Sequence, residues 1–292
     1  MNIGEYMNGI LIVDKQKGVT SRDVVNSVIK KLNIKKVGHT GTLDPIATGV
    51  LVICVGNATK LVDYFTNKDK EYIASVELGT LTDTLDSDGK IIKEEKSLKT
   101  KEEILNTLNS FKCTYLQEVP KYSAIKINGK KLYEYARNNE NVKLPSREVT
   151  INDIELLDDI EHLNNKTLFK FKCSVSKGTY IRSLIRDIAT KLGTIGIMTD
   201  LRRIRQGNFK IEDSVKIDDI YEDKLINILD ILDIKKIELS KDIEKKVLNG
   251  AYVNNIYNVD EVLFIKNNEA IALYKNDNKK LKPYIMFKGG II

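Results

Sequence analysis

The chemistry available to this 292-residue chain must come from carboxylate, phenol and guanidinium side chains. Its only histidines, His39 and His162, are too few for a histidine-rich metal centre, and no H-E-x-x-H motif is present. Cys54, Cys113 and Cys173 lie about sixty residues apart without a C-x-x-C pair, so neither a zinc site nor a disulfide framework is encoded. No phosphate-binding glycine loop appears either, and we therefore expect neither a metal nor a cofactor.

One polar loop concentrates groups that could react. It runs over residues 38–45 and combines two glycines with His39, threonines and Asp44, which precedes Pro45. On composition alone, the ordinary interpretation is a turn in which the Asp44 carboxylate hydrogen-bonds its own backbone. The alternative is a carboxylate that the loop presents for catalysis.

Apolar strands and an amphipathic helix flank this loop. Residues 9–14 and 50–55 read as short buried strands, and the helix between them begins at a capping-box pattern formed by Thr20 and Asp23. Further along, Tyr72 begins an alternating segment that predicts a strand with Ala74 and Val76 on the same face.

Strand and helix patterns interleave through the rest of the chain. Periodicity predicts helices over residues 101–108 and 182–192 and a strand over 169–176, whereas the Tyr- and Lys-rich segment 121–147 suggests a mobile arm. Short apolar runs near the end predict a small β-rich domain. We therefore expect two domains, over residues 1–232 and 233–292.

Positive charge gathers locally. The chain carries a net charge of +6, and residues 177–210 alone hold eight lysines and arginines against two aspartates, a local excess of 8 − 2 = +6. Such a segment is either the footprint of a phosphate backbone or an ordinary solvated surface. With no apolar run of membrane-spanning length and no export signal, we expect a cytoplasmic protein that does not contact membranes.

Several motifs, in one consistent order, resemble the bacterial TruB-type tRNA pseudouridine(55) synthases. Residues 38–49 read G-H-T-G-T-L-D-P-I-A-T-G, like the family motif that carries the essential aspartate. The other matching segments are Leu11-Ile-Val-Asp-Lys15 with Gly18 and Ser21, Lys70-Glu-Tyr72, Leu78-Gly79, Thr82-Asp-Thr84, Gln117, Pro120, Tyr122-Ser-Ala, Lys126, Tyr133-Glu-Tyr-Ala-Arg137, Lys177-Gly-Thr-Tyr-Ile-Arg-Ser-Leu184, Leu201-Arg-Arg203 and Gly207 with Phe209. The resemblance is strong over residues 9–210 and weak in the tail.

This resemblance implies an α+β fold, with the mixed central sheet of the pseudouridine synthases and a small β-rich, PUA-like C-terminal domain. It also implies the reaction: uridine 55 in the T-loop of tRNA is isomerised to pseudouridine on a flipped-out base, without a guide RNA. The bond from ribose C1′ to N1 is broken and remade to C5. This rearrangement is redox-neutral and can proceed without a metal or cofactor.

The family assigns catalytic roles to Asp44, Tyr72 and Arg182. Asp44 would attack the sugar or the base, or remove a ribose proton. Because a carboxylate beneath a base is desolvated, it needs a fixed cation to stay ionised, and Arg182 would supply it. Tyr72 would pack on the base and help remove the C5 proton. Without the motifs, Arg182 reads as a surface or phosphate-binding arginine and Tyr72 as a core tyrosine.

Further residues are expected to bind the substrate. By resemblance the base pocket comprises His39, Tyr72, Tyr180 and Leu201, although pattern alone would place Tyr180 and Leu201 in the core and make His39 a structural loop residue. The residues expected to contact RNA are Lys15, Arg202, Arg203 and the arm over 126–137.

Three positions depart from the family pattern. Gln16 replaces a usual proline, Val119-Pro120 replaces two prolines, and Ala189 replaces a usual glycine. These changes affect turn stiffness and helix packing, while Asp44 and Arg182 are retained.

Two other functions fit parts of the sequence. A non-catalytic RNA-binding module would need the same basic surface, and a guide-RNA-dependent synthase of the archaeal and eukaryotic type shares the aspartate loop. Retention of Asp44 with Arg182 favours catalysis, and the chain-wide bacterial pattern disfavours the guide-dependent type. We therefore expect the T-arm of tRNA as the partner of a monomeric enzyme that requires no other protein.

Overall fold

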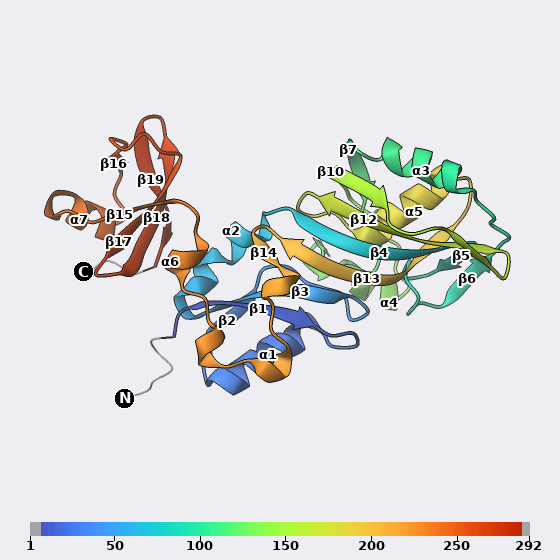
Figure 1. Ribbon diagram of the computed structural model, residues 1–292, viewed down its shortest axis with the longest axis horizontal. Coiled ribbons are helices and arrows are strands. Elements are labelled where there is room, and N and C mark those ends of the chain that lie inside the picture. Colours follow the sequence, from blue (N-terminus) through green and yellow to red (C-terminus); the bar gives the residue numbers. More distant parts are fainter. Residues whose placement is uncertain (1–6, 288–292) are drawn as a thin grey trace.

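A ten-stranded mixed sheet is the centre of the computed structural model, which describes residues 7–287 (Figure 1). Its main path runs β1-β3-β13-β4-β12-β10-β7, with β2, β11 and β14 paired at the side. The strands are β1 (Gly9–Lys15), β2 (Val37–His39), β3 (Thr48–Val55), β4 (Lys70–Leu78), β7 (Thr114–Glu118), β10 (Ser146–Leu156), β11 (Glu161–Leu163), β12 (Lys166–Val175), β13 (Gly196–Gln206) and β14 (Phe209–Lys210). Only β3 and β13 pair in parallel in this sheet.

The predicted helices are confirmed, and three of them share one hydrophobic core with the sheet. They are α1 (Ser21–Leu32), α3 (Lys101–Ser110) and α5 (Ile181–Lys191), and the short α2 (Val62–Thr66) follows β3. The side chains of Thr20 and Asp23 form the capping box that starts α1. In β1, Leu11 faces this core, whereas Ile10 faces a second cluster on the other side of the sheet.

The alternation predicted from residue 70 is confirmed in β4. Tyr72, Ala74 and Val76 are buried on the same face, and every second residue between them is more exposed. β4 pairs with β12 on one side and with β13 on the other, which places Tyr72 opposite Cys173 and Arg203. This central strand therefore positions Tyr72 in the middle of the sheet.

The basic segment over residues 177–210 contains the central strand β13, which its charge pattern did not predict. Its arginines are not free surface cations, because internal partners neutralise them. Arg202 pairs with Asp14 at 2.9 Å, and Arg205 pairs with Glu71 at 2.7 Å. These ion pairs tie β13 to β1 and β4.

A second, five-stranded sheet lies at the opposite end of the molecule from α3 (Figure 1). It comprises β15 (Lys235–Glu238), β16 (Val253–Asn254), β17 (Glu261–Lys266), β18 (Glu269–Asp277) and β19 (Lys280–Met286), with α6 (Ile228–Ile231) and α7 (Lys241–Leu248) beside it. The predicted β-rich segment is therefore confirmed. The Tyr64 hydroxyl of α2 donates to the Glu261 carboxylate of β17 at 3.0 Å, which links α2 to the second sheet. The boundary at residues 232 and 233 stays a prediction.

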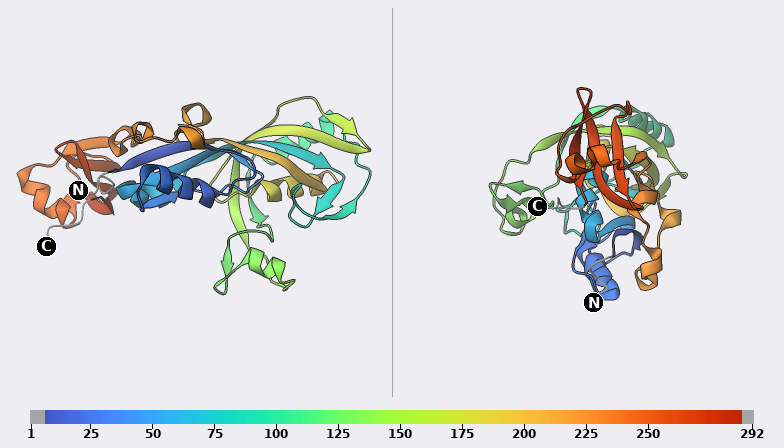
Figure 2. Two further views of the ribbon diagram at one scale, coloured as in Figure 1. Left: turned by 90° about the horizontal axis from the view of Figure 1, so that it is seen from below. Right: turned by 90° about the vertical axis from the view of Figure 1, so that its left-hand side faces the viewer.

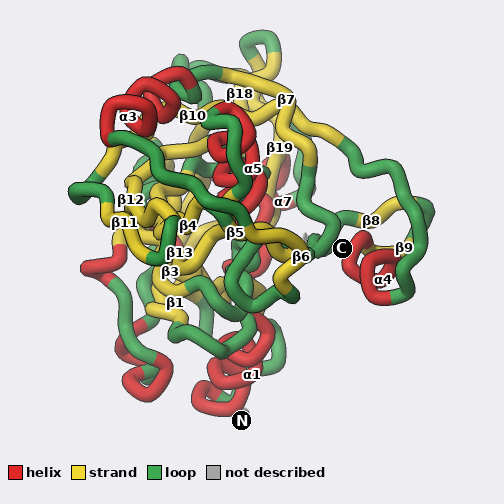
Figure 3. The backbone as a smooth tube through the Cα atoms, turned by 90° about the vertical axis from the view of Figure 1, so that its right-hand side faces the viewer, coloured by secondary structure: helices red, strands yellow, loops and turns green. Residues whose placement is uncertain are grey.

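The segment predicted as an arm projects from the sheet (Figures 2 and 3). It consists of the small hairpin β8 (Lys126–Ile127) and β9 (Lys130–Lys131), followed by α4 (Leu132–Arg137). Another hairpin, β5 (Thr80–Thr82) and β6 (Ile91–Glu94), extends from the end of β4. The turn between β5 and β6 and the first residues of the arm both reach toward the start of α5, through contacts described below.

A substitution at Gly49 tests how closely β3 approaches β13. Its φ is +100°, and an added Cβ would lie 2.2 Å from the carbonyl oxygen of Arg203. We expect Gly49→Ala to lower the free energy of unfolding by about 3 kcal/mol or more, because backbone strain and steric overlap combine.

Gly193→Ala is the matched control for urea unfolding of both variants. Its φ is +69°, but an added Cβ meets no described atom within 4 Å. It should cost only the conformational term of about 1–2 kcal/mol. Equal losses of unfolding free energy in the two variants would show that the close contact between β3 and β13 does not constrain Gly49.

Candidate active site

The loop over residues 38–45 is fixed by hydrogen bonds from two neighbouring elements, α1 and β13. Ser21, at the start of α1, exchanges hydrogen bonds with the backbone of Leu43, at 2.9 and 3.1 Å. The Gln206 amide of β13 donates to the hydroxyl and the carbonyl oxygen of Thr40, at 2.7 and 2.9 Å. These contacts satisfy polar groups of the loop just before Asp44 and so hold the backbone that carries its carboxylate.

Two buried cations complete this support. The Lys15 ammonium donates to the carbonyl oxygen of Val19 at 2.6 Å and to that of Pro45 at 3.4 Å. The Arg203 guanidinium donates to the carbonyl oxygens of Val50 at 2.6 Å and Gly41 at 3.0 Å. Burial lowers the pKa of Lys15 to about 8, and the nearby Asp44 carboxylate opposes this shift.

These positions correct part of the expected RNA-binding surface. Lys15 is 0% exposed and Arg203 is 1% exposed, so neither presents its charge to an RNA backbone. Their donors are directed to carbonyl oxygens of the chain itself. Arg202 is partly exposed and paired with Asp14, and its contact with RNA stays a prediction.

Arg182 binds Asp44 directly. Its Nη2 lies 2.8 Å from the Asp44 carboxylate, and this arginine side chain is almost fully buried. The same guanidinium donates to the carbonyl oxygens of Thr84 at 2.9 Å and Tyr122 at 3.0 Å. The aspartate loop, the β5–β6 turn, the base of the arm and α5 therefore meet at one side chain.

A second carboxylate, which sequence reasoning missed, also faces Arg182. Asp86 is 6% exposed, and its carboxylate lies 3.6 Å from Nη1 of Arg182. Burial raises the pKa of Asp86, while the Thr84 hydroxyl and the Arg182 charge act in the opposite direction. The turn was expected, but no local pattern distinguishes Asp86 from Asp83 or Asp88.

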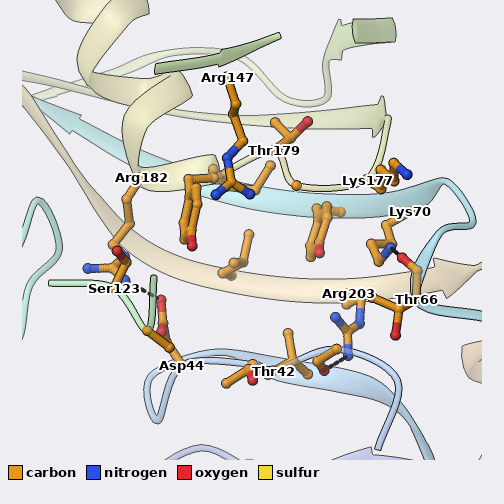
Figure 4. Close-up of a pocket in the computed structure, with 18 of the residues that line it drawn as sticks. Thr42, Asp44, Thr66, Lys70, Ser123, Arg147, Lys177, Thr179, Arg182 and Arg203 are labelled. Atoms are coloured by element: carbon orange, nitrogen blue, oxygen red, sulfur yellow. Dashed lines mark hydrogen bonds and ion pairs between the residues drawn. The ribbon is translucent and has the colours of Figure 1, made fainter. Parts of the chain in front are cut away.

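Asp44 and Arg182 lie on the wall of a cleft of about 760 Å³ (Figure 4). Tyr72, Tyr180 and Leu201 also line it, so the structure brings together most of the residues that the sequence singled out. Burial raises the pKa of the Tyr180 phenol, which keeps it protonated. A carboxylate beside an apolar and aromatic wall is an arrangement that can hold a planar base against a reacting group.

His39 stands apart from this group. It belongs to β2 and is not among the residues that line the cleft. Its Nδ1 accepts a hydrogen bond from the backbone N–H of Gly41 at 3.4 Å, and burial lowers the pKa of its imidazole. In this structure His39 therefore supports the loop, and its contact with the substrate stays a prediction.

Gln117 supports the aromatic wall from behind. It is fully buried, and its Oε1 accepts the backbone N–H of Tyr180 at 2.8 Å. Its amide nitrogen donates to the Tyr115 hydroxyl at 2.8 Å. The sequence showed Gln117 as part of a motif, but only the fold reveals that it holds the residue before α5.

Comparison with known proteins agrees with this geometry. The family model "TruB family pseudouridylate synthase (N terminal domain)" matches residues 30–181, and "tRNA pseudouridylate synthase B C-terminal domain" matches residues 182–229. The chain belongs to the TruB family. The resemblance inferred from the motifs is thereby confirmed.

Relatives in the TruB family match over nearly the full chain. The tRNA pseudouridine synthase B of Clostridium tetani is 43% identical over 277 residues, which cover 93% of each chain. The Mesoplasma florum protein of the same name is 44% identical over 276 residues, covering 93% of this chain and 94% of its own. A crystal structure of a Cbf5-Nop10-Gar1 complex matches with a TM-score of 0.70 and 25% identity, over 98% of this chain and 86% of that chain.

The predicted fold is confirmed by this structural match: a pseudouridine synthase sheet with a small PUA-like domain of β-strands. In the part that the structure describes, no three His, Cys, Asp or Glu side chains gather to hold a metal ion. Within residues 7–287, no helix is long and apolar enough to cross a membrane.

Asp86 provides a test of the network around Arg182. In Asp86→Asn the guanidinium loses one of its two anionic neighbours, and its orientation toward Asp44 becomes less well defined. We expect turnover on tRNA to fall about tenfold, equivalent to about 1.4 kcal/mol, with KM nearly unchanged.

Asp88→Asn is the matched control, because Asp88 is an exposed aspartate in the same turn. It should retain turnover. If both variants behave like the unmodified protein in steady-state kinetics, Asp86 has no part in positioning Arg182.

Proposed function

We propose that this protein isomerises uridine 55 in the T-loop of tRNA to pseudouridine, acting alone and without a guide RNA. The proposal rests on the 2.8 Å pair between Asp44 and Arg182 in a cleft that also contains Tyr72 and Tyr180. Relatives named tRNA pseudouridine synthase B, matched over nearly the whole chain, support tRNA as the substrate.

In this proposal Asp44 is the reacting carboxylate. Its side chain is 38% exposed on the cleft wall, whereas its partner Arg182 is only 6% exposed. The arginine therefore holds the carboxylate from behind, and the accessible oxygen faces the substrate. As the base enters and excludes water, this fixed positive charge keeps the carboxylate in its orientation toward the substrate.

Tyr72 and Tyr180 are proposed to hold the flipped base, together with Leu201. Tyr72 emerges from the central strand β4, and Tyr180 precedes α5. The reaction breaks the bond between C1′ and N1, joins C1′ to C5 and moves the proton of C5 away, leaving N1 protonated. The Tyr72 phenol is the group proposed to help remove the C5 proton.

The nucleotide must leave its stack before Asp44 can reach the glycosidic bond, and extrusion costs a few kcal/mol. The arm that carries α4 is proposed to contact the T-arm and offset part of this cost. Its lysine and arginine side chains stack on its own tyrosines: Lys130 on Tyr135, and Arg137 on Tyr133. We propose that one chain binds one tRNA, as a monomer.

Asp44→Asn is the direct test of the proposed reaction. It preserves the shape of the side chain and removes its charge, so turnover should fall below detection while folding and tRNA affinity remain nearly unchanged. The assay uses an unmodified tRNA transcript with no other protein or RNA, and pseudouridine is located by chemical mapping.

Asp63→Asn, an exposed aspartate on α2, is the matched control and should convert tRNA normally. A wild-type protein that binds tRNA without converting it would support an RNA-binding module instead. Conversion only after a guide RNA is added would support the guide-dependent type. Full activity of Asp44→Asn would remove Asp44 from the mechanism.

A further inference from the structure

The cationic side chains around the cleft differ in how many of their N–H donors already have an acceptor within the chain. Arg182 and Arg203 are committed to Asp44 and to carbonyl oxygens of the chain, as described above. Arg147, Lys177 and Lys70 also line the cleft but keep donors free. Figure 4 shows Arg147 reaching into the cleft from the wall opposite Asp44, with Lys177 and Lys70 farther along.

Arg147 is the least satisfied of these groups. Within residues 7–287 its guanidinium makes no hydrogen bond and no ion pair, although Glu148, an exposed residue, also lines the cleft. It stacks instead over the ring of Tyr180, with 5.5 Å between the guanidinium carbon and the ring centroid. Because a cation–π contact uses the charge of the guanidinium and not its N–H groups, those groups remain available to a ligand.

Gly178 makes this placement possible. Its φ is +81°, and an added Cβ would lie 3.0 Å from Nη1 of Arg147. The turn between β12 and α5 therefore leaves room for the guanidinium beside its backbone. The absence of a side chain at Gly178 therefore allows the Arg147 guanidinium to lie against this turn.

Two lysines add unused donors beside it. The Lys177 ammonium donates to the Asn67 side chain at 3.1 Å, which leaves two of its three N–H groups. The Lys70 ammonium donates to the carbonyl oxygens of Thr66 and Lys68, at 2.8 and 2.6 Å, which leaves one.

The two lysines also repel each other. Burial, together with the nearby charges of Arg203 and Lys177, lowers the pKa of Lys70 to about 8, and the Asp69 carboxylate opposes this shift. An anion bound among these groups would relieve that repulsion.

We propose that Arg147, Lys177 and Lys70 form a phosphate subsite, which binds one phosphodiester of the RNA strand adjoining the nucleotide in the base pocket. This inference rests on the proposed function and specifies how the same cleft holds its substrate. The planar guanidinium can contact two phosphate oxygens at once, and the lysines act as point charges. Because Arg147 stacks on Tyr180, the bound phosphate lies within about one nucleotide of the flipped base.

The test neutralises phosphates one at a time in a T-arm stem–loop RNA. Each RNA carries one methylphosphonate, with a 2′-deoxy sugar on its 5′ side for stability, and is compared with the same deoxy RNA bearing an ordinary phosphate. Affinity and single-turnover rate are measured for the wild type and for Arg147→Met. We expect one linkage next to the target uridine to lose about tenfold in affinity with the wild type. Arg147→Met should show no further loss at that linkage.

Lys177→Met is a second variant, which leaves the contact between Arg147 and Tyr180 intact. In this variant the methylphosphonate at the same linkage should lower RNA affinity less than it does in the wild type. Lys101→Met, on α3 and paired with Asp159, is the control and should respond as the wild type does. Inorganic phosphate added at millimolar concentration separates a general anion site from a strand-specific one, and we expect it to compete only weakly.

The outcomes distinguish the two proposals. A wild type that does not convert the unmodified stem–loop contradicts the proposed function. If the wild type converts the RNA, but each methylphosphonate lowers the RNA affinity of the wild type and of Arg147→Met equally, the result contradicts only the phosphate subsite. Tight competition by inorganic phosphate, without coupling to any linkage, also contradicts it.

Discussion

A single guanidinium, that of Arg182, is the constraint on which the rest of the site depends. It contacts the Asp44 carboxylate, the Asp86 carboxylate and two backbone carbonyl oxygens, so four segments distant in sequence must be folded before it is fully bound. A charged side chain buried without such partners would strongly destabilise the protein. The requirement to satisfy Arg182 therefore couples the aspartate loop, the β5–β6 turn and the base of the arm to the start of α5.

The aspartate loop is held with similar thoroughness from its other side. Lys15 and Arg203 place buried positive charge against the carbonyl oxygens of Pro45 and Gly41 in the loop and of residues that flank it. Hydrogen bonds from charged donors are stronger than those between neutral groups, and here they lie in a region shielded from water. The loop is thus held in place before substrate arrives, and little reorganisation is needed when the base enters.

The local patterns of the sequence predict much of the fold, because strand alternation and helix capping depend on neighbouring residues. β4 and α1 were predicted for this reason. β13 was not, because its arginines hide the strand pattern and their partners, such as Asp14 and Glu71, are more than a hundred residues away. The motif identified Asp44 and Arg182 as candidates. Asp86 and the buried state of Lys15 could not be inferred, since charge in a sequence does not reveal which side chains become enclosed.

The central claim is that Arg182 orients an ionised Asp44, and Arg182→Lys tests it most directly. Lysine retains one positive charge but lacks the planar fork that reaches a carboxylate and two carbonyl oxygens together. Single-turnover conversion and RNA affinity should be measured on the same preparation. The account predicts that conversion falls at least about tenfold while affinity changes far less. A loss of affinity in proportion to the loss of rate would instead make Arg182 a phosphate contact.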